Sequence, residues 1–475
     1  MNRKKMLWFC LVLVAGGVVL LAGCEGGISE NIRADEFDPS ILSFYVASEA
    51  EGGSDENDGT SEDTPLATLA NAYAKAQTDP DRKRVVVLSN LSEEGLVTLA
   101  PVSFVPERGH DAESIPDLNS RPDNGSVPDA DSTPGAGSIL IEGRISGLKI
   151  ERSTGANDSV LQIQDGAKIA FKNIMVEGKS TNRAILVTGS GTEVVLENKA
   201  MITGKSASND GSGIAVREGG KLVMKMGSVV SGCTGGSNMV AVYVVDGGDL
   251  EMNGGSRIYG NTALGGVKVK NGTFTMYGGE ISGNSATNNG GGVYLDEDGE
   301  FTMEGGLING NKAANSGGGI YLDNGGKFMM KAGVISGNEA VAGKGGGISA
   351  TGKSTVQMGG GRINGNSSKQ DGGGIDVCST HFIMEGGEIS GNIASGNGGG
   401  VFLDNQATSK FTMTGGVIYG SKANLENQQS LLANSTTDGL GAALFKSESA
   451  IIVNAEDVRG TTEVTIDKRQ FQVNN

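Results

Sequence analysis

A short segment recurs through the middle of the chain, and this repeat limits the folds that the chain can adopt. Between Phe274 and Asp404 each copy reads Phe-Thr-Met-x-Gly-Gly-x-Ile-x-Gly-Asn-x-Ala, followed by Gly-Gly-Gly-Val/Ile-Tyr-Leu-Asp, with local variation. The methionine of this pattern recurs every 24 to 29 residues, at Met252, Met276, Met303, Met330, Met358, Met384 and Met413. A period of this length predicts a stack of structural repeats, in which each copy packs on its neighbours.

Each copy has the residue pattern of short β-strands. Apolar and other residues alternate in Phe-Thr-Met and in Val-Tyr-Leu, and a period of two is typical of strands. Glycine pairs and triplets separate these segments and favour bends there. At roughly 3.3 Å per residue, a copy has room for three short strands and three turns. If each strand pairs in parallel with its counterpart in the next copy, the fold is all-β: a single-stranded parallel β-helix, or solenoid.

Stacking in register would place equivalent residues in columns, with neighbours about 4.8 Å apart. We expect an inward aromatic column, with Val356 as its odd member, formed by Phe274, Phe301, Phe328, Phe382 and Phe411. Asparagine tolerates turn conformations, and its amide can bond to the amide one coil away. We therefore expect a turn column formed by Asn261, Asn284, Asn311, Asn338, Asn366 and Asn392, with Ser421 in the last copy.

These motifs resemble those of two known groups of proteins. The asparagine column is similar to the ladders of right-handed β-helices of the pectate-lyase type. Gly-Gly-Gly-Val and Ile-Ser-Gly-Asn resemble short motifs of polymorphic outer-membrane proteins. Both resemblances imply a right-handed parallel β-helix. They imply little about function, because the residues that carry them are structural.

The N-terminus has the pattern of an export signal. Residues 1–5 are basic, an apolar run follows from Met6, and small residues precede Cys24. Leu-Ala-Gly-Cys at residues 21–24 resembles the bacterial lipoprotein signal-peptidase motif, which implies cleavage before Cys24 and acylation of this residue. The lipid anchor would hold the protein in the bacterial cell envelope, and we expect the outer membrane or cell surface rather than the inner membrane. An ordinary signal peptide and an uncleaved anchor are the alternatives.

The pattern divides the chain into six segments. The block after residue 43 resembles the N-terminal cap of bacterial right-handed β-helix proteins, with a strand, an acidic turn and a short helix over 65–77. Such a cap would cover the open end of the first coil. The segments are a signal peptide (1–23), a tether (24–43), an N-terminal cap (44–100), a Pro-rich exposed insertion (101–137), the β-helix coils (138–423) and a degenerate C-terminal coil with its cap (424–475).

Composition restricts the partners and the chemistry. The net charge is −17, and removing Arg3, Lys4 and Lys5 with the signal peptide makes it −20, which disfavours nucleic acid as a partner. The only two histidines, His110 and His381, form no recognisable set with a nucleophile and a carboxylate. No metal-ligand spacing for zinc is present. We therefore assign no catalytic residue and no metal site.

One outward face is a candidate ligand site. The strand that ends each copy would place Tyr294, Tyr321 and Phe402 in one column and Asp296, Asp323 and Asp404 in the next. Aromatic rings beside carboxylates can stack on a sugar chain and hydrogen-bond to it. Lyases of this fold need calcium-binding acids and a basic residue, yet no Arg or Lys joins these columns at the same level. A solvated surface, a glycan or cation groove, and a catalytic site all remain open.

A second acidic segment invites a calcium interpretation. Asp55-Glu56-Asn57-Asp58-Gly59 alternates oxygen ligands within a turn, but it lacks the distal bidentate glutamate. We expect an acidic turn of the cap and no resident cofactor. The sequence thus favours a lipid-anchored β-helix that presents a long face to a polysaccharide or to a host or envelope protein. The alternative is a polysaccharide lyase or glycoside hydrolase that acts on acidic polysaccharide.

Overall fold

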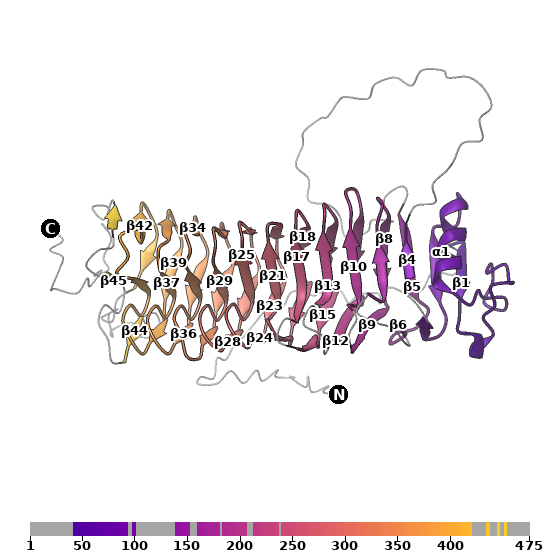
Figure 1. The fold of residues 1–475 in the computed structure, drawn as a ribbon, viewed down its shortest axis with the longest axis horizontal. Coiled ribbons are helices and arrows are strands. Elements are labelled where there is room, and N and C mark those ends of the chain that lie inside the picture. Colours follow the sequence, from indigo (N-terminus) through magenta and orange to yellow (C-terminus); the bar gives the residue numbers. More distant parts are fainter. Residues whose placement is uncertain are drawn as a thin grey trace, which may run out of the picture. The chain divides into compact units, whose positions relative to one another are not determined.

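The protein is a parallel β-solenoid with one short α-helix near its N-terminal end, as the sequence predicts (Figure 1). This computed structural model describes residues 41–93, 97–100, 138–152, 159–180, 183–206, 212–236, 239–419, 434–437, 444–446 and 451–453. Cys24 and the predicted Pro-rich insertion at 101–137 lie outside these ranges, as do the signal peptide and nearly all of the tether.

Within the described residues, four parallel sheets run along the stack, and we number them in the order in which one coil visits them. The first sheet contains β1 (Ser43–Val46), β2 (Arg84–Val87), β5 (Ile139–Gly143), β8 (Lys168–Lys172), β11 (Glu193–Leu196), β14 (Lys221–Met224), β18 (Asp249–Met252), β22 (Thr273–Met276), β26 (Glu300–Met303), β30 (Lys327–Met330), β34 (Thr355–Met358), β38 (His381–Met384), β42 (Lys410–Met413) and β46 (Ile451–Val453). The second sheet contains β3 (Leu91–Glu93), β6 (Lys149–Arg152), β9 (Met175–Ser180), β12 (Met201–Ser206), β15 (Val229–Ser231), β16 (Thr234–Gly235), β19 (Arg257–Tyr259), β23 (Glu280–Ser282), β27 (Leu307–Asn309), β31 (Val334–Ser336), β35 (Arg362–Asn364), β39 (Glu388–Ser390) and β43 (Val417–Ile418).

Among the described residues, the third sheet begins at β20, and the fourth sheet runs along the stack from β4. The third sheet contains β20 (Thr262–Ala263), β24 (Ser285–Ala286), β28 (Lys312–Ala313), β32 (Glu339–Ala340), β36 (Ser367–Ser368), β40 (Ile393–Ala394) and β44 (Ser435–Thr436). The fourth sheet contains β4 (Val97–Leu99), β7 (Leu161–Ile163), β10 (Ile185–Thr188), β13 (Ser212–Arg217), β17 (Val240–Val245), β21 (Val267–Lys270), β25 (Val293–Asp296), β29 (Ile320–Leu322), β33 (Ile348–Ala350), β37 (Ile375–Val377), β41 (Val401–Leu403) and β45 (Leu444–Lys446).

The predicted phenylalanine column fills the interior behind the first sheet. The ring centroids of Phe274 and Phe301 lie 4.3 Å apart, and those of Phe301 and Phe328 lie 5.0 Å apart. Val356 interrupts the column in register, and every member is at most 2% exposed. Burial of each ring stabilises the stack by about 1.5–3 kcal/mol. The aromatic column is therefore one of the apolar columns that fill the interior of the regular coils.

The predicted asparagine column forms a buried ladder at the turn between the second and third sheets. Asn311 shows its bonding: the side-chain Nδ2 donates to Asn338 Oδ1 at 3.0 Å and to Ile281 O at 2.9 Å, and the backbone N–H donates to the same Oδ1 at 3.0 Å. The ladder thus satisfies turn groups that would otherwise be buried unpaired. Asn434 accepts from Asn392 and extends the ladder, whereas Ser421, the predicted last member, lies outside the described residues.

Glycine is required at the bend between the first and second sheets. Gly306 has φ +92°, a conformation that side chains with a Cβ rarely adopt. A Cβ there would also lie 2.6 Å from Met276 Cε and 2.8 Å from Gly279 O. The interior methionine of one coil packs against the bend of the next, which explains why the repeat holds a methionine and a glycine pair at a constant offset.

The N-terminal cap contains the predicted helix, but the helix begins later than predicted. α1 spans Leu69–Thr78, because Thr68 caps it by accepting from the Asn71 backbone N–H. Leu66 instead forms a bridge to Val46 and is fully buried. The helix buries Leu69, Ala72, Tyr73 and Ala76. Within the described part of the chain, no helix has the length and the hydropathy needed to cross a bilayer.

Candidate functional site

The candidate ligand face is the outward side of the fourth sheet. Val293 and Leu295 are fully buried in the core, so Tyr294 lies on the opposite side of β25, as predicted. Register aligns Tyr294 with Tyr321 and, further along, with Ser349, Asp376 and Phe402. We call this row of residues the outer face. It also includes the acids two positions after each aromatic residue, which are Asp296, Asp323 and Asp404.

The outer face is more buried than a solvated surface would be. Tyr321 and Asp296 are each 9% exposed, and Phe402 is 6% exposed. The glycine-rich turn before each strand covers the two rings, because it folds back beside the outward side chain. A Cβ on Gly317 would lie 2.7 Å from Tyr321 Cβ, and one on Gly398 would lie 2.8 Å from Phe402 Cβ. The turns therefore form one wall of the outer face.

Two lysines lie over the aromatic rings of the outer face. Lys268 Nζ is 4.7 Å from the centroid of Tyr294, and Lys344 Nζ is 4.5 Å from that of Phe402. The rings of Tyr294 and Tyr321 pack edge to face, with their centroids 5.2 Å apart. The expectation that no Arg or Lys joins these columns was wrong. Lys268 pairs in register with Tyr294, so the repeat pattern could have predicted a lysine in this column. Lys344 lies in the turn before β33, and its position could not be predicted from the strand pattern.

The protein's own donors engage the carboxylates of the outer face. Asp296 lies 3.4 Å from Lys268 Nζ and accepts from Asn324 Nδ2 at 3.0 Å. Asp323 accepts from Thr351 Oγ1 at 2.9 Å. Asp404 accepts from Ser409 Oγ and from the Gln406 backbone N–H. Direct bonds to the protein therefore stabilise the carboxylates of Asp296 and Asp323.

One buried acid lies in the middle of the outer face. Asp376 is 2% exposed, and Ser349 Oγ donates to its Oδ2 at 2.9 Å. Burial raises the pKa of Asp376 to about 7, against the opposing effect of the Lys344 charge. Burial and a bond to Asp404 raise the pKa of the neighbouring Cys378 to about 12, so that thiol is not a ready nucleophile.

The acidic turn of the cap uses its carboxylates within the chain. Asp55 accepts from the backbone N–H groups of Ala67 and Thr68 at 3.1 and 3.0 Å. Asp58 accepts from Thr64 Oγ1 at 2.8 Å, and bonds to Thr60 and Thr64 lower its pKa. Among the described residues, no group of three or more His, Cys, Asp or Glu side chains is placed to hold a metal ion. The geometry matches the structural turn that we expected.

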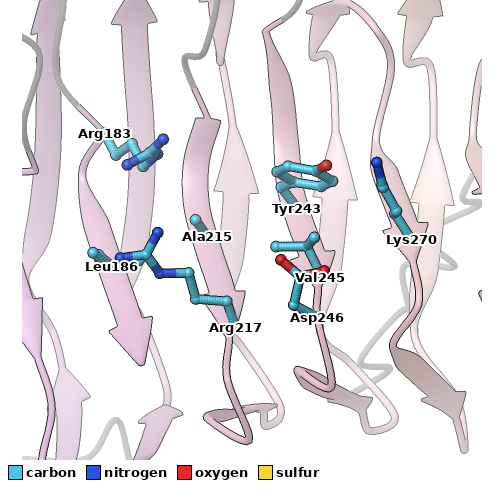
Figure 2. A pocket seen from close by; sticks show the side chains of 8 residues that line it. All are labelled: Arg183, Leu186, Ala215, Arg217, Tyr243, Val245, Asp246 and Lys270. Atoms are coloured by element: carbon cyan, nitrogen blue, oxygen red, sulfur yellow. The ribbon is translucent and has the colours of Figure 1, made fainter. Parts of the chain in front are cut away.

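A hollow of about 250 Å³ lies on the outward side of the same sheet, in earlier coils that the sequence analysis did not single out (Figure 2). It spans β10, β13, β17 and β21, and its lining comprises Arg183, Leu186, Ala215, Arg217, Tyr243, Val245, Asp246 and Lys270. These coils depart from the repeat, so no periodic pattern marks the residues. In the sequence, only the arginines and lysines at outward positions of these strands could have indicated the hollow.

Comparison with known protein families gives a match over the later coils. The family model described as "Right handed beta helix region" matches residues 224–383 and 265–454. The chain contains a right-handed β-helix region. No curated protein and no solved structure matches the chain.

The outer face of this right-handed β-helix combines aromatic rings with charges whose positions are set by neighbouring coils. Side chains that are already paired and half-buried lose little freedom when a ligand binds, which favours binding. Ser349 Oγ donates to Asp376 Oδ2, whereas among the described residues Asp376 Oδ1 has no hydrogen-bond partner. The arrangement is therefore suited to recognition, and its one chemically unusual group is the Asp376 carboxyl.

Proposed function

We propose that the protein is an exported, lipid-anchored right-handed β-helix that binds a polysaccharide along the outer face without cleaving it. The observation that carries this proposal is the in-register row of Tyr294, Tyr321 and Phe402, with lysines over two of the rings. Aromatic faces bind sugar rings, and fixed charges hydrogen-bond to their hydroxyl groups. A host or envelope protein that docks on the same face is the other partner class that the proposal allows.

Export and anchoring enter the proposal through the signal sequence. The apolar run that ends at Leu-Ala-Gly-Cys supports acylation of Cys24 and a place in the bacterial envelope, at the outer membrane or the cell surface. The net charge of −20 after cleavage supports a partner other than nucleic acid.

One observation favours a second candidate function, a polysaccharide lyase or glycoside hydrolase. Asp376 has a pKa raised to about 7 by burial, and a carboxyl group that titrates near neutral pH can act as a general acid or base. Its 2% exposure weighs against this role, because a substrate would have to displace the turn that covers it.

The test is a glycan array probed with mature protein (residues 24–475), followed by a reducing-sugar release assay on every glycan that binds. We expect binding without release. Release of sugar ends by the native protein, lost in Asp376→Asn, would replace the binding proposal with the enzymatic one. An array without any bound glycan would refute polysaccharide binding and turn attention to protein partners.

A matched variant locates the binding. Tyr294→Ala with Tyr321→Ala removes two outward rings, and we expect affinity for the array ligand to fall at least tenfold, about 1.4 kcal/mol. The melting temperature should fall less than in Phe328→Ala, because neither ring belongs to the interior apolar cluster. The control is Tyr277→Ala, which removes a 54%-exposed tyrosine away from the outer face. Unaltered affinity in the double variant would place the site elsewhere.

A further inference from the structure

The hollow on β10, β13, β17 and β21 exists because Ala215 has a short side chain between two larger outward residues. Register sets Leu186, Ala215 and Tyr243 side by side on the outward face. Leu186 is 5% exposed and Ala215 is 3% exposed, so both contribute apolar floor rather than open surface. Ala215 leaves space between its larger neighbours, and the half-buried ring of Tyr243 stands beside that space (Figure 2). The hollow can therefore take one face of a ring.

Positive side chains surround this floor. Arg183, Arg217 and Lys270 line the hollow, and Asp246 is the one acid in the lining. The lining therefore carries a net positive charge, whereas the whole chain carries a net charge of −17. Figure 2 shows the Arg217 guanidinium extending toward Leu186, while Lys270 lies beyond Tyr243. An anion seated on the floor would thus have a cation on either side.

Two of these cations pair with exposed glutamates of the chain. Arg217 Nε lies 3.5 Å from Glu218, whose side chain is 60% exposed. Lys270 Nζ lies 2.8 Å from Glu297, whose side chain is 54% exposed. Exposed pairs of this kind contribute little to stability, so a ligand anion can replace the glutamate at small cost. Arginine also suits carboxylate and sulfate groups, because its planar fork donates two parallel hydrogen bonds.

Tyr243 completes the set with a neutral donor. Burial raises its pKa, so the phenol remains protonated at neutral pH and keeps its O–H. Its ring offers an apolar face, and its hydroxyl can bond to a ring substituent. The hollow therefore combines stacking, a neutral hydrogen bond and two flanking cations within a single small volume.

We infer that this hollow binds an acidic sugar unit, a pyranose ring that carries a carboxylate or a sulfate. The identity of the ligand as a sugar rests on the proposed function, whereas the requirement for an anion rests on the hollow alone. Tyr243 stacks on the ring, and Arg217 or Lys270, one on each side of Tyr243, takes the anion in place of its own glutamate, Glu218 or Glu297.

The test titrates the mature protein with three single-sugar probes: methyl glucuronide, methyl glucoside 6-sulfate and uncharged methyl glucoside. We expect both charged probes to bind at least tenfold more tightly than the uncharged one, and their affinity to fall as salt rises, because the interaction is between charges. The preference between the two charged probes tells carboxylate from sulfate. Equal affinity for all three probes would overturn the inference.

Variants place the binding in the hollow. Arg217→Gln with Lys270→Gln should abolish the preference for charged probes. Ala215→Trp should block all three by filling the floor. Arg362→Gln is the matched control, since Arg362 is 64% exposed, pairs with Glu388 on the second sheet and should leave affinity unchanged. Circular dichroism confirms that each variant is folded. Retained charge preference in the double variant would refute the site.

This test separates the inference from the proposed function. If the array gives bound polysaccharides but the charged probes show no advantage, only the inference fails. If the charged probes bind through Arg217 and Lys270 but no polysaccharide binds, the hollow is an acidic-sugar site and polysaccharide binding fails. If neither binds, both are refuted.

Discussion

At the scale of single residues, Asp376 gives the clearest dependence on pH. Burial raises its folded-state pKa to about 7, above the ordinary value of 3.8. The folded state therefore holds the proton more tightly than the unfolded chain, and stability is lost as pH rises from about 4 through 7. Asp376→Asn keeps the site neutral. We expect it to stabilise the protein at pH 8 by on the order of 2–4 kcal/mol and to have little effect at pH 4.

Denaturant unfolding at both pH values measures this difference. Asp63→Asn, at an exposed position of the cap, controls for the loss of one charge and should show no such dependence. The same effect of Asp376→Asn at pH 4 and pH 8 would contradict a difference in the pKa of this carboxyl between the folded and unfolded states.

Side-chain direction was predictable at this scale, but side-chain environment was not. Alternation placed Tyr294 and Asp296 outward, and the register confirms it. The 9% exposure of Asp296 depends on Asn324 and Lys268, which belong to other coils. The sequence shows which residues share a column, whereas the path of the turns decides how far each is covered.

At the scale of the strand, the phenylalanine column predicts how the stack melts. Phe328→Ala should cost about 3–5 kcal/mol, because it removes a buried ring that stacks on Phe301. Coils contact mainly their neighbours, so the loss can divide one transition into two melting units. Scanning calorimetry measures this. Thr302→Ala, on the outward side of the same sheet, should leave the melt nearly unchanged. A normal melt for Phe328→Ala would contradict the stabilising role of the column.

Element boundaries were predictable where the repeat is regular and less so where it ends. The segment predicted as a degenerate C-terminal coil (424–475) contains β45 and β46, and both strands pair with the preceding coil. The helix start was misplaced because Thr68 and Asp55 set the cap through contacts that periodicity does not reveal. Asn434 continues the ladder 42 residues after Asn392, which a constant period could not anticipate.

At the scale of the whole molecule, acylation of Cys24 would determine where the β-helix works. Leu-Ala-Gly-Cys follows an apolar run, so Cys24→Ser should leave an uncleaved precursor that takes up no acyl label. Metabolic labelling with a fatty-acid analogue and gel mobility measure both effects. Cys10→Ser, within the apolar run, should still be cleaved and labelled. Labelled protein of mature size from Cys24→Ser would place the acceptor elsewhere, and a binding face would then have to act without a lipid anchor at this residue.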